Sequence, residues 1–444
     1  MNMGDTAAFL RCTETDCSSQ YPISERYYSC PACGGLLEVE YDFRFPSTPD
    51  ALKAAFRGRK LEDEPAYRSG VWRFHELLPF VPDLSRVVTL FEGNTPIYDA
   101  PLSSDYCGLP GLRFKHQGMN PTGSFKDNGM TTGVTAARMS GAAAVACAST
   151  GNTSASMAAY AARAGIQSLV FVPAGRISHG KLAQALEYGA RVIELEGSFD
   201  DAMRIVRELA VESGLYLLNS VNPFRLEGQK TIVIEMLEQL GWTPPDWIVL
   251  PGGNLGNCSA FGKALRELSS LGFIDRVPRL AVIQARGAAP FYTLFKSPKR
   301  DRLVPVTQPA TLASAIRIGS PVSWPKALRS LELTNGVVEQ VSENEIADAK
   351  AVIGRDGIGC EPASAVTLAG AKQMVSNRII ARDSTVVCVL TGNLLKDPGY
   401  TIDYHSRKLK LDTPEGERMI LVTRANTPER LPADKAAIRR HLKL

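Results

Sequence analysis

Short apolar runs alternate with segments of helical periodicity over most of the chain from residue 112 onward. The apolar runs are continuous, which is typical of strands that a parallel sheet buries on both faces. Predicted strands lie at 112–118, 142–149, 168–175, 190–197, 215–220, 247–253, 280–287 and 385–393, and predicted helices at 154–165, 181–189 and 199–214. Alternation of this length predicts an α/β architecture with parallel sheets.

The two ends of the chain differ from this central region. The N-terminal segment is rich in cysteine and contains a predicted strand at 36–41, and a polar, arginine-rich helical stretch and a connector punctuated by proline follow it. The tail is charged, with a predicted small strand at 419–423 and a short basic helix at the end. We therefore predict four regions: a cysteine-rich segment (1–45), a helical connector (46–99), a central α/β domain of two subdomains (100–405) and a charged tail (406–444).

Composition and charge narrow the functional classes. The chain has 444 residues, of which 44% are hydrophobic, and its formal net charge is +4 with both signs spread along it. This balance favours neither a nucleic-acid nor a membrane partner, and no apolar run approaches the roughly 20 residues of a spanning helix. The N-terminus lacks the basic and apolar regions of a signal peptide. The odd number of cysteines, nine, suits a reducing compartment, so we expect a cytoplasmic protein.

Four predicted strands end in loops rich in polar residues and glycine: 149–153 (STGNT), 219–225 (NSVNPFR), 251–257 (PGGNLGN) and 390–393 (LTGN). In open α/β sheets, ligands bind beyond the carboxyl ends of the strands, where such loops lie. The loop 251–257 has three glycines and no acidic residue, so its backbone N–H groups can converge on one phosphate at a helix N-terminus. Taken alone, each loop also has a plain structural explanation as a helix cap or a turn.

Lys126 lies in the segment NPTGSFKDNGM (120–130), between a glycine-containing turn and the start of a predicted helix. A lone lysine is usually a solvated side chain. The turn can instead place it under a pocket, where burial favours the neutral amine that forms a Schiff base with an aldehyde. Together with a cradle for one phosphate, the amide of Asn152 and the hydroxyl of Thr391 for a ring nitrogen, this lysine indicates a site for pyridoxal 5'-phosphate.

Six segments of the chain, in this order, resemble the threonine synthase family from about residue 90 to about residue 404. They are KHQGMNPTGSFKDNGM, STGNTSAS, NSVNPFRLEGQKT, PGGNLGN, AIRIGSPVSW and EPASA. The resemblance implies a fold-type-II pyridoxal-phosphate enzyme, similar to the tryptophan synthase β-chain, with two parallel-sheet α/β subdomains and a small N-terminal segment that is similar to a zinc ribbon. It also implies a homodimer.

The resemblance further implies roles for individual residues. Lys126 would be the catalytic residue, carrying the cofactor and moving protons. The other implied cofactor contacts are Asn152 at the 3'-hydroxyl, Gly253, Asn254, Leu255, Gly256 and Asn257 at the phosphate, and Thr391 at the ring nitrogen. The implied substrate contacts are Ser149 and Thr153 at the carboxylate, and Ser220 and Arg225, with Asn219 nearby, at the substrate phosphate. A guanidinium can bind a phosphate in a bidentate manner, which suits Arg225 to this task.

The activity that the resemblance implies is conversion of O-phospho-L-homoserine and water into L-threonine and phosphate. Two related lyases stay open as alternatives, a cysteate synthase that acts on phosphoserine and a threonine dehydratase. A dehydratase that acts on a free hydroxyl would not need the phosphate-binding segment 219–225. A hydrolase built on Ser124 and Lys126 is less consistent with the chain, which has no G-x-S-x-G or H-E-x-x-H motif.

Four cysteines of the N-terminal segment have a spacing that suits zinc. Cys12 and Cys17 are separated by four residues, and Cys30 and Cys33 by two, as in ribbons with four thiolate ligands. A metal-free relic of such a ribbon is the alternative. A nucleic-acid-binding zinc module is a third reading, but the segment has no cluster of basic and aromatic residues to support it.

Overall fold

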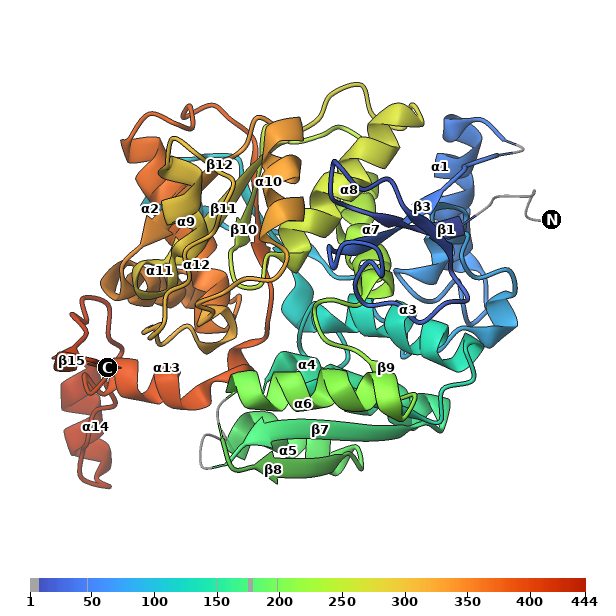
Figure 1. Cartoon of the computed structure of the whole chain (residues 1–444). Helices are drawn as coiled ribbons and strands as arrows, with labels where there is room; N and C mark the ends of the chain where they lie inside the picture. The colour runs from blue at the N-terminus through green and yellow to red at the C-terminus, as the bar shows by residue number, and fades with distance from the viewer. Residues whose placement is uncertain (1–7, 46, 150, 175–178, 198) are drawn as a thin grey trace.

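The computed structural model of the chain describes residues 8–45, 47–149, 151–174, 179–197 and 199–444, apart from the side chains at 179–181, 199–200, 202–203 and 211. Two α/β units and a small N-terminal sheet make up most of the molecule (Figure 1). The strands are β1 (Ala8–Cys12), β2 (Gln20–Pro22), β3 (Leu37–Tyr41), β4 (Ile97–Asp99), β5 (Leu112–His116), β6 (Ala144–Ala148), β7 (Gln167–Pro173), β8 (Arg191–Leu195), β9 (Tyr216–Leu217), β10 (Trp247–Pro251), β11 (Arg279–Ala285), β12 (Val337–Val341), β13 (Val386–Leu390), β14 (Lys410–Thr413) and β15 (Gly416–Met419). The α-helices are α1 (Pro49–Gly58), α2 (Pro101–Cys107), α3 (Lys126–Met139), α4 (Asn152–Ala164), α5 (His179–Glu187), α6 (Phe199–Glu212), α7 (Pro223–Gln239), α8 (Gly256–Ser270), α9 (Pro290–Lys296), α10 (Trp324–Leu333), α11 (Glu343–Arg355), α12 (Pro362–Ser376), α13 (Pro398–His405) and α14 (Lys435–Leu442).

The larger sheet has the order β12-β11-β10-β13-β5-β4, and its strands are parallel except for the antiparallel edge strand β4. Successive residues of β10 point to opposite faces. Ile248 and Leu250 join a core with α7, α8 and α10, whereas Trp247 and Val249 join a core with α2, α11 and α12. Burial on both faces explains why these strands are continuous apolar runs in the sequence.

The smaller sheet has the order β8-β7-β6-β9, and all of its strand pairs are parallel. The helices α4 and α6 pack against its strands β6 and β7. All the strands predicted between residues 112 and 393 are present, so the prediction of parallel α/β subdomains is confirmed.

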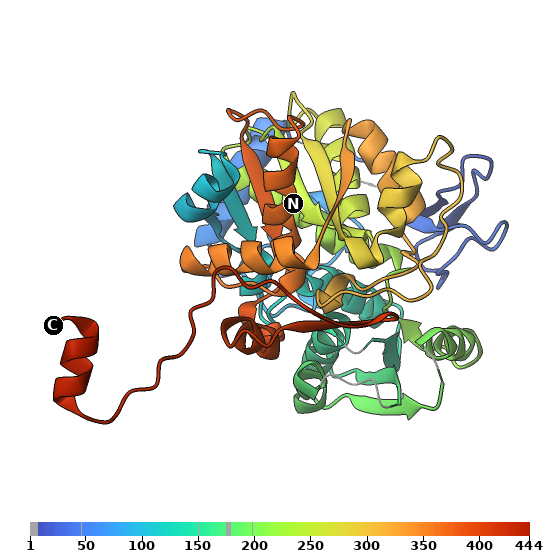
Figure 2. The ribbon, with the colours of Figure 1, turned by 90° about the vertical axis from the view of Figure 1, so that its left-hand side faces the viewer.

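The predicted strand at 419–423 is wrong. The strand β15 ends at Met419 and pairs with β14 instead. Ile420 is buried in an apolar cluster with Tyr400, Tyr404 and Leu409, and Val422 packs against that cluster. Side-chain packing rather than strand pairing therefore accounts for this apolar run. The predicted basic helix at the end is present as α14, which stands apart from the body of the molecule in Figure 2.

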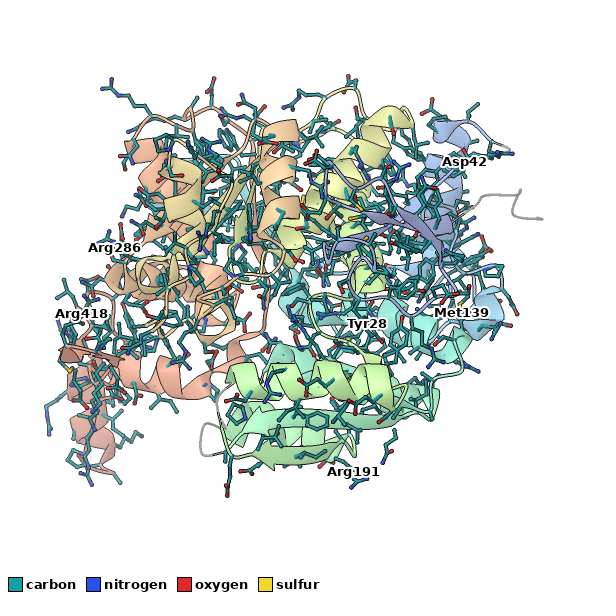
Figure 3. All side chains as sticks on the ribbon, in the orientation of Figure 1. Tyr28, Asp42, Met139, Arg191, Arg286 and Arg418 are labelled. Atoms are coloured by element: carbon teal, nitrogen blue, oxygen red, sulfur yellow. The ribbon has the colours of Figure 1, made fainter. Side chains whose placement is uncertain are left out.

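The N-terminal sheet, of order β2-β1-β3, lies against helices of the larger unit. Lys326 on α10 donates to the carbonyl oxygen of Leu37 at 2.6 Å, and the hydroxyl of Tyr41 donates to Glu227 on α7 at 2.8 Å. The hydroxyl of Tyr28, labelled in Figure 3, accepts the backbone N–H of Leu217 in the smaller sheet at 2.7 Å. The segment therefore contacts both α/β units. Within the described residues, no helix is both long and apolar enough to span a membrane.

Candidate active site

Lys126 begins α3, and hydrogen bonds fix the turn before it to the end of β13. The backbone N–H of Phe125 donates to the carbonyl oxygen of Thr391 at 2.9 Å, and Ser124 pairs with Gly392 in an isolated bridge. Gly123 has a φ of +81°, a conformation that a residue with a side chain rarely adopts. The lysine turn and the end of a central strand are thus joined, as the predicted convergence of strand-end loops requires.

The residue after the lysine fixes the turn from its other side. The buried carboxylate of Asp127 accepts the backbone N–H and the hydroxyl of Thr122, both at 2.7 Å, and the hydroxyl of Ser156 on α4 at 2.5 Å. Burial raises the pKa of Asp127 to about 6, although these hydrogen bonds oppose the rise. The start of α3 is therefore attached to the smaller α/β unit as well as to the larger sheet.

The amine of Lys126 is chemically unusual. Its Nζ lies 4.0 Å from the centre of the Phe125 ring, and the residue as a whole is only partly exposed. Loss of hydration lowers the pKa of Lys126 to about 7; Arg225 lowers it further and Glu361 opposes the change. A large fraction of this amine is neutral near pH 7, whereas an ordinary lysine is almost fully protonated there. A neutral amine is the nucleophile that a carbonyl cofactor needs.

Asn152, Thr391 and Glu361 meet beside the lysine turn. The Nδ2 of Asn152 donates to one carboxylate oxygen of Glu361 at 3.0 Å, and the hydroxyl of Thr391 donates to the other at 3.2 Å. The hydroxyl of Ser364 accepts the backbone N–H groups of Thr391 at 2.8 Å and Gly392 at 3.1 Å. Two residues predicted to contact the cofactor therefore share a carboxylate that also acts on Lys126.

The loop 251–257 connects β10 to the N-terminus of α8. Leu255 adopts a left-handed conformation with a φ of +66°, which directs the chain sharply into the helix. The loop is held in place because the N–H of Ser323 donates to the carbonyl oxygen of Asn254 at 3.3 Å, and the N–H of Val322 donates to its side chain at 3.4 Å. A Cβ on Gly253 would lie 3.2 Å from the Ala315 carbonyl oxygen, so the chain passes tightly here. The first N–H groups of α8 at Gly256 and Asn257 suit an anion.

The residues predicted for the substrate have different surroundings. Ser149 and Thr153 flank the start of α4, and both are partly buried; the Ser149 hydroxyl accepts the N–H of Gly151 at 3.2 Å. The amide of Asn219 bonds both the N–H and the carbonyl of Ala148, at 3.1 and 3.0 Å, so it joins two strand ends. Ser220, which follows it, is partly buried.

Arg225 is buried and lacks a carboxylate partner among the described residues. Its Nη1 donates to the carbonyl oxygen of Leu218 at 3.0 Å, and its Nε has no hydrogen-bond partner in the described part of the chain. Burial lowers the pKa of Arg225 to about 10. A dehydrated guanidinium without a counter-charge is unfavourable unless an anion binds to it.

Unpaired polar atoms test whether these residues fit pyridoxal phosphate. The Oδ1 of Asn152 is buried and has no donor among the described residues, so it can accept a hydrogen bond from a hydroxyl group of a ligand. The Nε of Arg225 needs an acceptor, and the loop 251–257 offers N–H groups at a helix N-terminus. Together with the partly neutral amine of Lys126, these groups fit both an aldehyde cofactor that carries a phosphate and a second anion.

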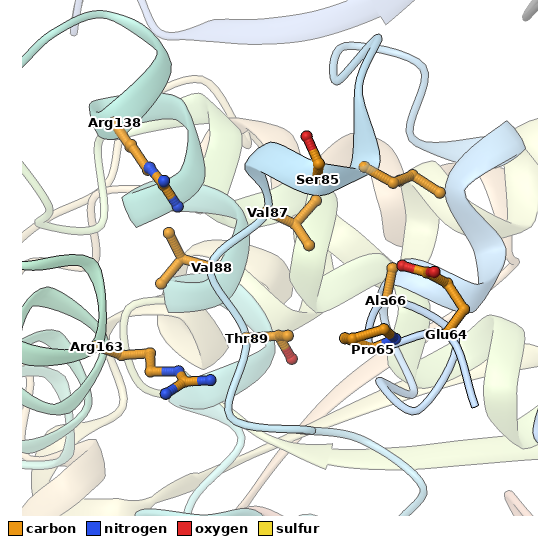
Figure 4. A pocket seen from close by; sticks show the side chains of 10 residues that line it. Glu64, Pro65, Ala66, Ser85, Val87, Val88, Thr89, Arg138 and Arg163 are labelled. Atoms are coloured by element: carbon orange, nitrogen blue, oxygen red, sulfur yellow. The ribbon is translucent and has the colours of Figure 1, made fainter.

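A cavity of about 390 Å³ elsewhere in the molecule has a different lining. It lies between the connector and the C-terminal ends of α3 and α4, where Arg138 and Arg163 line it (Figure 4). Thr89 and Glu64 form part of its other wall. None of its lining residues belongs to the predicted site, so this cavity is distinct from the cluster around Lys126.

Comparison with known proteins agrees with the geometry around Lys126. Residues 88–392 match the family described as pyridoxal-phosphate dependent enzyme. The threonine synthase of Methanocaldococcus jannaschii is 46% identical over 397 residues, which cover 89% of this chain and 95% of that protein. The threonine synthase of Methanosarcina acetivorans is also 46% identical, over 89% of this chain and 93% of its own length. This chain belongs to the threonine synthase family. The resemblance found in the six sequence segments is thereby confirmed.

Solved structures show the fold of this threonine synthase family member independently of close sequence similarity. Maize serine racemase superimposes with a TM-score of 0.58 at 20% identity, over 79% of this chain and 94% of that chain. The processed form of threonine deaminase isoform 2 from Solanum lycopersicum gives a TM-score of 0.58 at 19% identity, over 78% and 90% of the two chains. The predicted fold-type-II architecture is confirmed.

Two polar residues of the cluster around Lys126 were not predicted from the sequence. Glu361 lies directly before Pro362 and resembles an ordinary residue at a helix start, although it belongs to the segment EPASA. Asp127 follows Lys126 and resembles an acidic residue in the first turn of α3. The sequence did contain one signal for Glu361, since it is the only charged residue of the segment EPASA.

The four N-terminal cysteines lie together. The Sγ atoms of Cys12, Cys17, Cys30 and Cys33 all lie within 4.8 Å of one another. The Sγ atoms of Cys12 and Cys33 are 3.4 Å apart, and those of Cys17 and Cys30 are 3.7 Å apart. Four converging thiols are the donor set that tetrahedral zinc prefers.

Proposed function

We propose that the chain is a threonine synthase that converts O-phospho-L-homoserine and water into L-threonine and phosphate. The observation that carries the proposal is the pair formed by Lys126 and Arg225, since a partly neutral amine and an unpaired buried guanidinium act on each other electrostatically. One suits a carbonyl cofactor and the other suits an anionic group on the substrate. Family membership at 46% identity supports the same activity.

In this proposal Lys126 would hold pyridoxal phosphate through its amine, and it would also be the group that moves protons at the substrate carbons. When bound, the cofactor supplies an electron sink for a carbanion next to the amino group. Asn152 contacts its 3'-hydroxyl, and Thr391 contacts its ring nitrogen. Backbone groups of Gly253, Asn254, Leu255, Gly256 and Asn257 would hold its phosphate. The low pKa of Lys126 suits a group that accepts and returns protons near neutral pH.

Other residues of the chain orient the substrate. Ser149 and Thr153 bind its carboxylate at the start of α4, where the helix N-terminus favours a negative charge. Ser220 and Arg225 bind the substrate phosphate, with Asn219 supporting the loop between them through its two bonds to Ala148. The guanidinium of Arg225, which the carbonyl oxygen of Leu218 holds in place, would stabilise the phosphate both before and after it leaves the γ-carbon.

Substrate assays separate the proposal from related lyases. Purified protein loaded with pyridoxal phosphate is incubated with phosphohomoserine, phosphoserine or threonine, and both phosphate and amino-acid products are measured. We expect phosphate and threonine in equal amounts from phosphohomoserine and little product from the other two. Turnover of phosphoserine with sulfite would favour a cysteate synthase, and ammonia release from threonine would favour a dehydratase.

We further propose that the four-cysteine cluster holds a structural zinc ion, because all four thiols can reach one point. Metal analysis of the purified protein should find zinc, and a Cys33→Ser variant should contain much less. A protein that is active and fully stable without bound zinc would contradict this part of the proposal.

We also propose a cytoplasmic homodimer. Five cysteines are buried as free thiols: Cys107, Cys147, Cys258, Cys360 and Cys388. Free thiols suit a reducing compartment. The homodimer follows from the family resemblance, and light scattering of the purified protein tests it.

A further inference from the structure

The carboxylate of Glu361 has a defined place in the active site. The residue is 1% exposed, and its backbone N–H donates to the carbonyl oxygen of Gly392 at 3.0 Å. Its two carboxylate oxygens accept from Asn152 at 3.0 Å and Thr391 at 3.2 Å. A Cβ on Gly392 would lie 2.4 Å from the carboxyl carbon, so the glycine makes room for this position.

Capping of α12 does not explain this carboxylate. Glu361 stands at the N-cap position of α12, yet its side chain accepts no hydrogen bond from the first turn. Its oxygens are directed instead to Asn152, which begins α4 in the smaller unit, and to Thr391, which follows β13 in the larger one. The carboxylate therefore connects residues from both α/β units.

The hydrogen bonds around Glu361 constrain how its two neighbours can serve a ligand. Because an ionised carboxylate only accepts, Asn152 must present Nδ2 to it, and this leaves the unpaired Oδ1 as the free end of the amide. Thr391 has a single hydroxyl proton, and the structure directs it toward Glu361. The Ser364 hydroxyl lies 3.0 Å from the Thr391 hydroxyl and fixes it from the other side.

We propose that Glu361 is a positioning residue that sets the orientations of Asn152 and Thr391 toward the cofactor and supplies the negative charge beside Lys126. This inference rests on the proposed function, because it takes Asn152 and Thr391 as cofactor contacts. Glu361 fixes which end of the Asn152 amide is available. Because Glu361 accepts the single proton of the Thr391 hydroxyl, that hydroxyl keeps a lone pair for the cofactor, which can bond the ring nitrogen when the nitrogen carries a proton. It also partly offsets the positive charge of Arg225 around the amine.

The test compares Glu361→Gln and Glu361→Ala with a matched control, Glu343→Gln. Glu343 is also a buried glutamate at the start of a helix, and its carboxylate accepts the N–H of Leu312 at 3.2 Å. Apoprotein of each variant is titrated with pyridoxal phosphate, and the dissociation constant and the position of the visible absorbance band are recorded. Melting temperature, kcat and KM are measured on the same preparations.

We expect both Glu361 variants to bind pyridoxal phosphate about tenfold more weakly or worse, with a displaced absorbance band, since charge-assisted hydrogen bonds are lost. Their kcat should fall more than their substrate KM changes, and Glu343→Gln should keep the wild-type band and dissociation constant. Wild-type dissociation constant and absorbance band in Glu361→Gln would overturn the inference, even if its melting temperature fell. If Glu361→Ala does not fold, Glu361→Gln decides the matter.

The same measurements separate this inference from the proposed function. Cofactor affinity and the absorbance band do not depend on which substrate the protein uses. Failure of the wild-type protein to form threonine from phosphohomoserine would overturn the substrate assignment alone. Unaltered cofactor binding in the Glu361 variants would overturn the positioning role alone.

Discussion

The helix α7 carries two buried cationic side chains within two turns, and they differ in whether a carboxylate pairs with them. Near its start, Arg225 has no carboxylate partner among the described residues. Farther along, Lys230 lies 2.7 Å from both Glu227 and Glu267, and Glu227 also accepts from Tyr41 at 2.8 Å. The first charge acts on Lys126, whereas the second group lies where β3 of the N-terminal sheet packs against α7 and where Lys263 of α8 donates to the carbonyl oxygen of Val39.

The pKa directions reflect this difference. Burial lowers the pKa of Arg225 to about 10. Lys263 on α8 belongs to the paired group, since its Nζ lies 2.5 Å from Glu227. Burial also acts to lower the pKa of Lys263, but the neighbouring Glu227 and Glu267 outweigh it and raise that pKa. A buried charge that is fully paired therefore supports packing, whereas a buried charge left without a partner indicates a place for a ligand.

The largest expected effect is that of Lys126→Ala. We expect kcat for threonine formation to fall by at least about 10³-fold, because the variant loses both the covalent attachment and the base. Its free energy of unfolding should change little, since the substitution removes a poorly hydrated amine that forms no ion pair with any described residue. Steady-state kinetics and urea denaturation measure the two quantities. A variant that keeps a tenth of the wild-type kcat would contradict the catalytic role.

The reverse outcome is expected for Lys230→Met. Removal of this amine leaves Glu227 and Glu267 buried with one partner fewer, and breaking such a group costs about 3–5 kcal/mol of unfolding free energy. Urea denaturation measures the loss, and Lys299→Met, on an exposed lysine, is the control with little expected change. The folded variant should keep the wild-type kcat. Wild-type stability would show that the paired group is not structural.

Arg225→Met should act on the substrate rather than on stability. We expect the KM for phosphohomoserine to rise on the order of 100-fold, because a buried guanidinium that binds a phosphate is lost. The free energy of unfolding should not fall by more than about 1 kcal/mol, since the charge that is removed has no carboxylate partner among the described residues.

Arg73→Met is the matched control for Arg225→Met. Arg73 is equally buried, but it lies 3.2 Å from Glu235 and 2.7 Å from Glu238. This control should lose stability and leave KM unchanged. If both variants changed only stability, Arg225 would have no role in substrate binding.

A smaller effect concerns the pH dependence of Lys126 in the apoprotein. Because its pKa is lowered to about 7, the amine is charged below that pH and neutral above it. About 90% of it is neutral at pH 8, against less than about 1% of an ordinary lysine. We expect its acetylation rate, followed by mass spectrometry, to level off above about pH 8, whereas the lysine of an unstructured reference peptide continues to react faster up to pH 10. A rate for Lys126 that keeps rising beyond pH 9 would contradict the lowered pKa.

The sequence predicted the parts of the fold and site that depend on local pattern. Strands buried on both faces are continuous apolar runs, so β10, β11 and β13 were recognisable. Because the carboxyl ends of parallel strands share one edge, the loops after them could be grouped before any contact was known. Family resemblance then supplied the residue roles, which remain predictions.

The parts that were not predicted depend on long-range contacts. The strand β12 lies at the sheet edge and has the sequence VVEQV, in which two polar residues interrupt the apolar run, so it lacks the continuous apolar pattern. Glu227 and Lys230 look like the solvated face of a helix until the N-terminal sheet covers them. Asn219 was predicted to lie near the substrate phosphate. The two hydrogen bonds of its amide to Ala148, 71 positions away, could not be predicted from the sequence.

The central claim is that Lys126 carries the cofactor, and chemical reduction tests it most directly. Protein loaded with pyridoxal phosphate is treated with borohydride, digested and analysed by peptide mass spectrometry. The account predicts a pyridoxyl group on Lys126, with no comparable labelling of the paired lysines Lys115 and Lys230. A pyridoxyl group on any other lysine, with Lys126 unmodified, would contradict the account.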